Sequence, residues 1–265
     1  MKCPTALTIA GSDSGGGAGI QADLRTFAFH QVHGTSAITC VTAQNTLGVQ
    51  RVDSLSPEAV AAQIESVAAD IGIQGVKTGM LLNEGIIQAA AQSIQKYGLE
   101  SRLVVDPVMV SRTGAQLIDD SAIAQLQQQL VPLAALVTPN RYEVQILSGQ
   151  EINTLDDMKA AAELIYHKGA NSVLVKGGAM SEPAQGKDVW FNGEQLEVLS
   201  ATPVATKNNH GTGCTLSAAI AANLALGKAL KTAIQESKTY LTAALEFSLD
   251  LGQGSGPVGH FFPLR

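Results

Sequence analysis

The sequence is poor in cysteine, in charge and in long apolar runs, and each shortage excludes a class of protein. Its three cysteines, Cys3, Cys40 and Cys214, have spacings that fit neither a disulfide framework nor a zinc site. Charged residues make up only 15% of the chain, and the net charge of -6 argues against nucleic acid or an anionic membrane as the main partner. No apolar run reaches about 18 residues and the N-terminus does not resemble a secretory signal, so we expect a cytoplasmic protein without a transmembrane helix.

What the chain does contain is enough apolar sequence for a sizeable core. Hydrophobic residues make up 45% of the 265 positions. The sequence shows no internal repeat, linker or low-complexity block, and its length suits one large domain. We therefore expect a single domain over residues 1–265.

Short apolar runs alternate along the chain with longer segments of helical character. Strands are expected at 5–10, 35–43, 73–77, 103–105, 134–137 and 172–176, followed by a hairpin at 189–199 with a type I′ signal at Asn192-Gly193. Helices are expected at 20–31, 57–70, 83–96, 119–130, 156–168, 212–226 and 230–248. This alternation predicts an α/β protein whose mostly parallel sheet is covered by helices on both faces.

The most informative segment is a polar turn at 208–215, Asn-Asn-His-Gly-Thr-Gly-Cys-Thr, which runs into a segment of high helix propensity. Unpaired backbone N–H groups and the positive end of the helix dipole make such a helix start a site for an anion such as phosphate. Cys214 lies in the first helical turn, where the positive helix end favours a thiolate. The alternative is a turn that caps a buried helix beside an inert cysteine, and this segment alone does not decide between the two.

A second glycine-rich segment follows the first strand, with five glycines among residues 11–19. A loose dinucleotide-binding pattern is present, but it requires an acidic residue about 20 positions further on, and none occurs between Asp23 and Asp53. We reject that interpretation. The density of glycine after a strand favours a binding loop over a merely flexible turn.

Polar residues also gather just beyond the expected strands, and in a parallel sheet all these positions share one edge. They are Gln44, Thr78, Asp106, Asn140 and Lys176. Asp106 and Glu143 could bind Mg²⁺ together with water and nucleotide phosphates. The alternative is a strand-end cap and a solvated helix residue.

Lys176 precedes Gly177-Gly178 and could contact a nucleotide phosphate, or it could be a surface lysine. Asp188 could line the same nucleotide side, or merely begin the hairpin. The sequence has no P-loop and no nucleophile-elbow motif. Its histidines lack metal-ligand spacing. Only His210 belongs to the polar turn at 208–215, called the anion turn below, where it could orient the loop or take part in chemistry.

Taken together, these segments resemble the hydroxymethylpyrimidine/phosphomethylpyrimidine kinases of thiamine biosynthesis, within the ribokinase-like superfamily. The similarity runs nearly end to end and is carried by residues 10–23, 42–46, 77–81, 105–109, 138–140, 175–178 and 210–215. It implies a three-layer α/β/α domain and two successive phosphorylations by ATP, the first on a pyrimidine hydroxymethyl group and the second on the resulting monophosphate. It also implies a homodimer.

The resemblance further assigns site residues. It implies a pyrimidine pocket lined by Gly11, Ala18, Asp23, Gln44, Met80 and Val108, a magnesium site at Asp106 and Glu143, and a nucleotide side at Asn140, Lys176 and Asp188. Cys214 would be the catalytic base, and the backbone of Gly211, Thr212 and Gly213 would receive the developing phosphate charge. The residue types agree, because an amide such as Gln44 can pair with an aminopyrimidine edge and Met80 suits a flat ring.

Two positions depart from the family pattern. Asn209 stands where the family usually has threonine, and the tail at 252–260 is poorer in histidine than is usual. We expect little loss at Asn209, because asparagine tolerates turn geometry. The tail leaves in doubt any contact that the family's histidines make. Two other functions stay open: a pyridoxal or pyridoxine kinase of the same superfamily, and a non-catalytic ligand-binding protein on the same scaffold.

Overall fold

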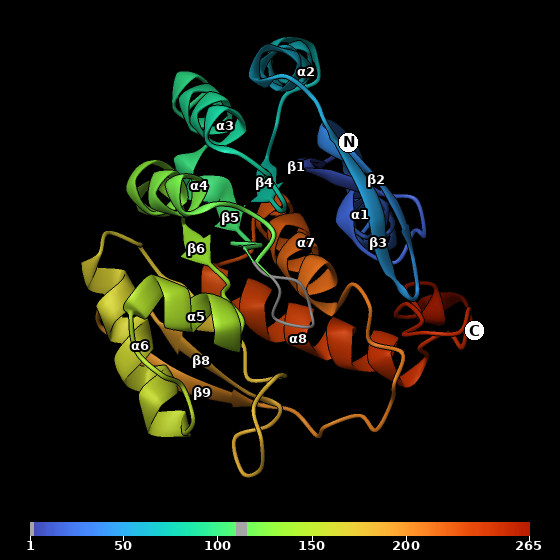
Figure 1. Cartoon of the computed structure of the whole chain (residues 1–265), viewed down its shortest axis with the longest axis vertical. Coiled ribbons are helices and arrows are strands. Elements are labelled where there is room, and N and C mark those ends of the chain that lie inside the picture. The colour runs from blue at the N-terminus through green and yellow to red at the C-terminus, as the bar shows by residue number, and fades with distance from the viewer. Residues whose placement is uncertain (1–2, 110–115) are drawn as a thin grey trace.

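A single mixed sheet organises the computed structural model, which describes residues 3–109 and 116–265 (Figure 1). Within these residues the strand order is β3-β2-β1-β4-β5-β6-β7-β8-β9. The strands are β1 Thr5–Asp13, β2 His33–Asn45, β3 Gly48–Ser54, β4 Gly75–Thr78, β5 Leu103–Val105, β6 Leu136–Val137, β7 Val173–Val175, β8 Lys187–Phe191 and β9 Leu196–Ser200. The six central strands run parallel, whereas β3, β8 and β9 pair antiparallel at the two edges.

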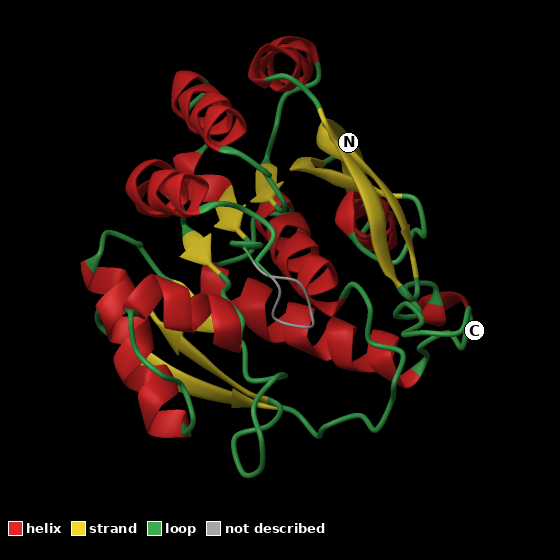
Figure 2. Cartoon of the chain, in the orientation of Figure 1, coloured by secondary structure: helices red, strands yellow, loops and turns green. Residues whose placement is uncertain are grey.

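Helices cover both faces of this sheet, which gives three layers (Figure 2). They are α1 Gly19–Phe29, α2 Pro57–Asp70, α3 Glu84–Lys96, α4 Asp120–Gln125, α5 Arg141–Ser148, α6 Leu155–His167, α7 Thr212–Ala225 and α8 Leu230–Glu246. One apolar cluster joins the sheet to α2 through α6, and a second joins its other face to α1, α7 and α8. The predicted α/β/α architecture is confirmed.

Side-chain caps explain where several helices begin. Ser56 accepts a hydrogen bond from the Ala59 N–H at 3.2 Å, with Pro57 in the first helical position of α2. Helices α5 and α6 each begin with a capping box, in which the cap residue and an acidic residue three positions later satisfy each other's backbone N–H groups. Helix α7 is different, because Gly211 caps it without any side-chain hydrogen bond. Its first N–H groups are therefore left to other partners.

Two local predictions were wrong. Strand β3 was not predicted, because it is an exposed edge strand whose polar residues lack the alternation of a half-buried strand. The hairpin between β8 and β9 is present, but its turn is not type I′, since Gly193 has a positive φ and Asn192 does not. Instead, the Asn192 side chain accepts hydrogen bonds from the N–H groups of Glu194 and Gln195, which shapes a longer loop.

The packing of β4 against α7 sets the position of the predicted anion turn. A Cβ placed on Gly75 would lie only 2.3 Å from the carbonyl oxygen of Ala221 on α7. The absence of a side chain at this position therefore lets the helix backbone lie directly on the strand.

We expect Gly75→Ala to destabilise the protein by about 1–3 kcal/mol, because the clash is with backbone and cannot be relieved by a rotamer change. The measurement is the urea midpoint at an unchanged m-value. Gly178→Ala is the control, since a Cβ at Gly178 would meet no atom within 4 Å. Equal midpoints for the two variants would show that the contact with α7 has no such cost.

Candidate active site

The carboxyl edge of the parallel strands brings several predicted site residues together. Asp106, just beyond β5, and Lys176, just beyond β7, form an ion pair of 2.9 Å between Oδ1 and Nζ. The start of α7 lies against this pair, because a Cβ on Gly213 would be 3.4 Å from Lys176 Nζ and 3.6 Å from Asp106 Oδ2. Ser217, one turn further along α7, donates to Asp106 Oδ2 at 3.3 Å. A carboxylate, an ammonium group and an uncapped helix start thus meet at one place.

Glu143 lies close to this cluster and is almost completely buried. Its Oε2 accepts a hydrogen bond from the Asn140 N–H at 2.7 Å as part of the capping box of α5. Burial raises the pKa of Glu143 to about 8, opposed by the ammonium of Lys176 and reinforced by the charge of Asp106. A buried carboxyl group in this condition is one that a nearby cation would help to ionise.

The two carboxyl groups fit Mg²⁺, which needs oxygen ligands and commonly keeps several waters. Within the part of the chain that the structure describes, no group of three or more His, Cys, Asp and Glu side chains could form a complete metal cage. A magnesium ion held by Asp106 and Glu143 would therefore take its remaining ligands from water and phosphate oxygens.

Cys214 lies in the first turn of α7, where the sequence left its protonation state open. Burial raises the pKa of its thiol to about 11, although the ammonium group of Lys77 and a hydrogen bond from the Gly19 N–H lower it. The loss of hydration destabilises the charged sulfur by more than these neighbours stabilise it. At neutral pH the free protein therefore carries Cys214 as a thiol.

Asp13 is the central residue that sequence reasoning missed. Its buried carboxylate accepts hydrogen bonds from the N–H groups of Gly15, Gly17 and Ala18, at 2.8 to 3.0 Å. His210 Nε2 lies 2.9 Å from Asp13 Oδ2. Burial acts to raise the pKa of Asp13, but the hydrogen bonds from His210 and the backbone outweigh it and hold the pKa below its usual range. Asp13 thus joins the glycine-rich loop to the anion turn.

The two segments also touch through their backbones, which explains two of the glycines. A Cβ on Gly17 would lie 2.2 Å from the His210 ring, and a Cβ on Gly211 would lie 1.8 Å from the Gly17 carbonyl oxygen. Gly211 also has a φ of +84°, which favours glycine. The signal that could have identified Asp13 was its place inside this loop, since a short acidic side chain among glycines readily accepts backbone N–H groups.

Five of the six predicted pyrimidine-pocket residues lie at three places in the structure. Gln44 lies near His210, and Ala18 is tied to Asp13, so both border the anion turn. Gly11 faces Met80, since a Cβ on Gly11 would lie 3.1 Å from Met80 Cε. Val108 follows Asp106 at the tip of β5 and is half-buried.

Asp23 does not reach this surface in the structure. It is completely buried and forms an ion pair of 2.9 Å with Lys77, while Thr8 donates to the same carboxylate at 2.6 Å. This arrangement does not support the prediction that Asp23 lines the pyrimidine pocket. The carboxylate of Asp23 is instead the buried ion-pair partner of Lys77. Lys77, which sequence reasoning did not single out, thereby becomes a fixed positive charge near Cys214.

Asp188 has a similar supporting role. Its Oδ1 accepts the Gly177 N–H at 2.9 Å and its Oδ2 pairs with Lys238 of α8. The side chain therefore holds the loop after Lys176 in place. Direct contact of Asp188 with a nucleotide remains a prediction.

The C-terminal tail packs against the anion turn. The Asn208 side chain accepts the Gly256 N–H at 3.0 Å, and the His210 N–H donates to the Gly256 carbonyl at 3.0 Å. His260 is buried 2.9 Å from the Thr215 hydroxyl, and burial lowers its pKa to about 4. A tail with one histidine therefore still fastens the turn through its backbone and a neutral imidazole.

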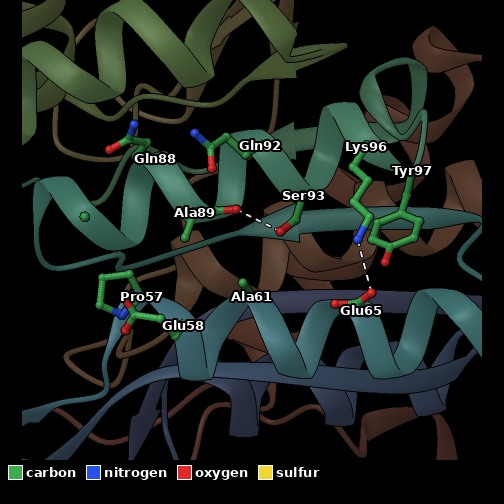
Figure 3. Close-up of a pocket in the computed structure, with 11 residues that line it drawn as sticks. Pro57, Glu58, Ala61, Glu65, Gln88, Ala89, Gln92, Ser93, Lys96 and Tyr97 are labelled. Atoms are coloured by element: carbon green, nitrogen blue, oxygen red, sulfur yellow. Dashed lines mark hydrogen bonds and ion pairs between the residues drawn. The ribbon is translucent and has the colours of Figure 1, made fainter.

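A surface hollow of about 520 Å³ lies away from this site, between α2 and α3 (Figure 3). It is lined by Pro57, Glu58, Ala61, Glu65, Gly85, Gln88, Ala89, Gln92, Ser93, Lys96 and Tyr97. None of the predicted site residues contributes to it.

Within the described residues, no helix is long and apolar enough to cross a membrane.

The fold and the site together define a class, a ribokinase-like kinase whose uncapped helix start, at α7, lies at the carboxyl edge of the sheet. Residues 13–259 match the family model for phosphomethylpyrimidine kinase, and the chain belongs to that family. A hydroxymethylpyrimidine/phosphomethylpyrimidine kinase of Synechococcus elongatus is 57% identical over 264 residues, covering 100% of both chains. The enzyme of the same name from Bacillus subtilis is 45% identical, covering 98% of this chain and 96% of its own.

Solved structures support the same fold. An ADP complex of Bacillus subtilis pyridoxal kinase aligns with a TM-score of 0.91 and 41% identity, covering 97% of each chain. A phosphomethylpyrimidine kinase of Clostridium difficile aligns with a TM-score of 0.81 and 41% identity, covering 91% of this chain and 99% of the other.

The protonation state of Cys214 can be measured by alkylation with iodoacetamide in a Cys3→Ser background, since Cys40 is buried. With a pKa of about 11, only the rare thiolate reacts, so the rate should rise about tenfold per pH unit from pH 7 to 10 without a plateau. The Cys214→Ser variant supplies the background rate. A plateau below pH 9 would contradict the effect of burial described above.

Proposed function

We propose that this kinase phosphorylates 4-amino-5-hydroxymethyl-2-methylpyrimidine with ATP, and then phosphorylates the monophosphate to the diphosphate, in thiamine biosynthesis. The observation that carries the proposal is the meeting of Lys176, Asp106 and Cys214 at the uncapped start of α7. The names of the similar enzymes supply the substrate.

In this proposal the start of α7 binds the phosphoryl group in transfer. The N–H groups at Gly211, Thr212 and Gly213 have no side-chain cap, and the helix dipole adds to their attraction for negative charge. Lys176 would exchange its contact with Asp106 for a nucleotide phosphate, and Asn140 borders the same strand through its bridge with Lys176. Asp106 and Glu143 would hold magnesium, which would supply positive charge to neutralise the phosphates.

Cys214 is proposed to accept the proton of the attacking hydroxyl group. It can do so only as a thiolate, so the resting thiol must first lose its proton to solvent water. The ammonium groups of Lys77 and Lys176 both interact favourably with a charged sulfur and reduce the free energy of this step. The Gly19 N–H adds a hydrogen bond.

The pocket for the pyrimidine ring is proposed to lie between the glycine-rich loop and the tip of β4. Gln44 offers acceptor and donor atoms in one plane, and Met80 offers an apolar wall beside Gly11.

We further propose that the enzyme is a cytoplasmic homodimer.

Pyridoxal phosphorylation is a second candidate, favoured by the structural likeness to pyridoxal kinases. A Staphylococcus aureus pyridoxal kinase solved with an ATP analogue and pyridoxal aligns with a TM-score of 0.90 and 34% identity over 99% of this chain. Its substrate is likewise a flat ring with a hydroxymethyl group. Pyridoxal has no aminopyrimidine edge for Gln44 to pair with, which favours the pyrimidine.

The function is tested by ³¹P NMR of the purified protein with MgATP and each substrate. The aminopyrimidine should give first the monophosphate and then the diphosphate signal. A much higher kcat/KM for pyridoxal would reverse the choice of substrate. If neither compound is phosphorylated, the protein has the fold of the family but not the proposed activity.

The Cys214→Ser variant should lower kcat by about a hundredfold or more, because a hydroxyl group is a far weaker base than a thiolate. ATP affinity, measured by calorimetry, should stay within about threefold, since Cys214 is proposed to act on the substrate hydroxyl group and Lys176 to contact the nucleotide phosphate. Cys3→Ser, at an exposed position, is the matched control. Turnover that survives in Cys214→Ser would remove the cysteine from the proton transfer.

A further inference from the structure

We propose that Asp13, His210 and Thr42 act as positioning residues that fix the side-chain amide of Gln44 in one orientation, so that the substrate ring enters with its hydroxymethyl group toward Cys214. This inference rests on the proposed function and deepens it.

The backbone of Gln44 is fixed by its surroundings. The pairing of β2 with β3 is irregular between Ala43 and Gln44, and such irregularities redirect a side chain from the regular strand alternation. The Gln44 N–H donates to Ser14 Oγ at 2.8 Å, and the Ser14 hydroxyl lies 2.8 Å from the Gln44 carbonyl oxygen. Gln44 is thus held against the glycine-rich loop, and its side chain has a defined origin.

The amide of Gln44 lies between two polar groups. One end is 3.4 Å from His210 Nε2, and the other is 3.2 Å from Thr42 Oγ1. The structure places Nε2 of Gln44 at the histidine end. Which end carries the nitrogen is nevertheless an assignment that follows from the hydrogen-bond partners.

The partner of His210 decides the assignment. Its Nε2 lies 2.9 Å from the carboxylate of Asp13, which can only accept, so this ring nitrogen must carry the hydrogen. A second donor, the NH₂ group of Gln44, would then face an N–H group without an acceptor between them. With Gln44 Oε1 at this end instead, the His210 N–H can be shared between two acceptors.

Thr42 supports the same assignment at the other end. Its hydroxyl group has one hydrogen and lies 3.0 Å from the Ser12 carbonyl oxygen, which can only accept. The hydroxyl oxygen is then free to accept from Gln44 Nε2. Exchanging Oε1 and Nε2 of Gln44 therefore gives both ends of the amide a hydrogen-bond partner. The Thr42 hydroxyl group and His210 Nε2 each need only the one hydrogen that they carry.

This orientation has a consequence for the substrate. Gln44 keeps one unused lone pair on Oε1, at the His210 end, and one unused N–H at the Thr42 end. An aminopyrimidine pairs with them by its 4-amino group and ring N3, so its amino group must lie at the His210 end. The hydroxymethyl group on the adjacent C5 then lies on the side of the turn that contains His210 and Cys214. The opposite amide orientation would reverse the ring and direct the hydroxymethyl group away.

The experiment compares two substrates, 4-amino-5-hydroxymethyl-2-methylpyrimidine and its analogue without the 4-amino group, by the ratio of their kcat/KM values. Thr42→Val keeps the shape of the side chain and removes the acceptor. We expect this ratio to fall about tenfold in Thr42→Val, the size of one lost hydrogen bond, and to change less than about twofold in Thr42→Ser. A general loss of packing would lower both kcat/KM values together and leave the ratio unchanged.

His210→Phe is the second variant, and the ratio makes it informative even though it lowers turnover with both substrates. The ratio should fall there as well. An unchanged ratio in both variants, with a wild type that phosphorylates the aminopyrimidine, would overturn the positioning role and leave the proposed function intact. A wild type that does not phosphorylate the aminopyrimidine would overturn both.

Discussion

The geometry of the candidate active site depends on one buried carboxylate, that of Asp13. Its contact with His210 joins positions 197 residues apart, and its three backbone hydrogen bonds shape the glycine-rich loop at the same time. Donors on every side explain why this carboxylate is stable in its charged form despite burial. A neutral residue there would leave those N–H groups and the imidazole without an acceptor. The end of the first strand and the turn before α7 therefore meet through a hydrogen bond between a carboxylate and an imidazole.

Glycine makes this meeting possible, because the two segments approach closer than side chains would allow. The contact of Gly211 with the Gly17 carbonyl places the beginning of α7 directly beside the loop. That position leaves no room for a side-chain cap, and the absence of such a cap at the start of α7 follows from it. The requirement for close backbone contact and the capacity to bind an anion are thus two results of the same local packing.

The sequence predicted those parts of the site that the sheet topology imposes. Asp106 and Lys176 each follow a parallel strand, so their meeting required only the knowledge that the strands are parallel. Burial, in contrast, depends on the whole fold. Neither the pairing of Asp23 with Lys77 nor the high pKa of Cys214 could be inferred from local sequence, because both result from desolvation by distant segments. Strand β3 was missed for the opposite reason, since an exposed edge leaves no apolar pattern.

The two ion pairs of the site differ in a way that suits a reaction in which charge arrives and leaves. Lys77 and Asp23 are both 0% exposed, and the pair is further held by Thr8, so it is a permanent part of the structure. In the other pair Lys176 is 13% exposed and Asp106 only 3%. A phosphate can therefore compete for Lys176 from the open side, and the carboxylate that Lys176 leaves is then available to a cation. One pair supplies a constant field at Cys214, and the proposed role of the other is to exchange its internal partners for ligands of the same charge.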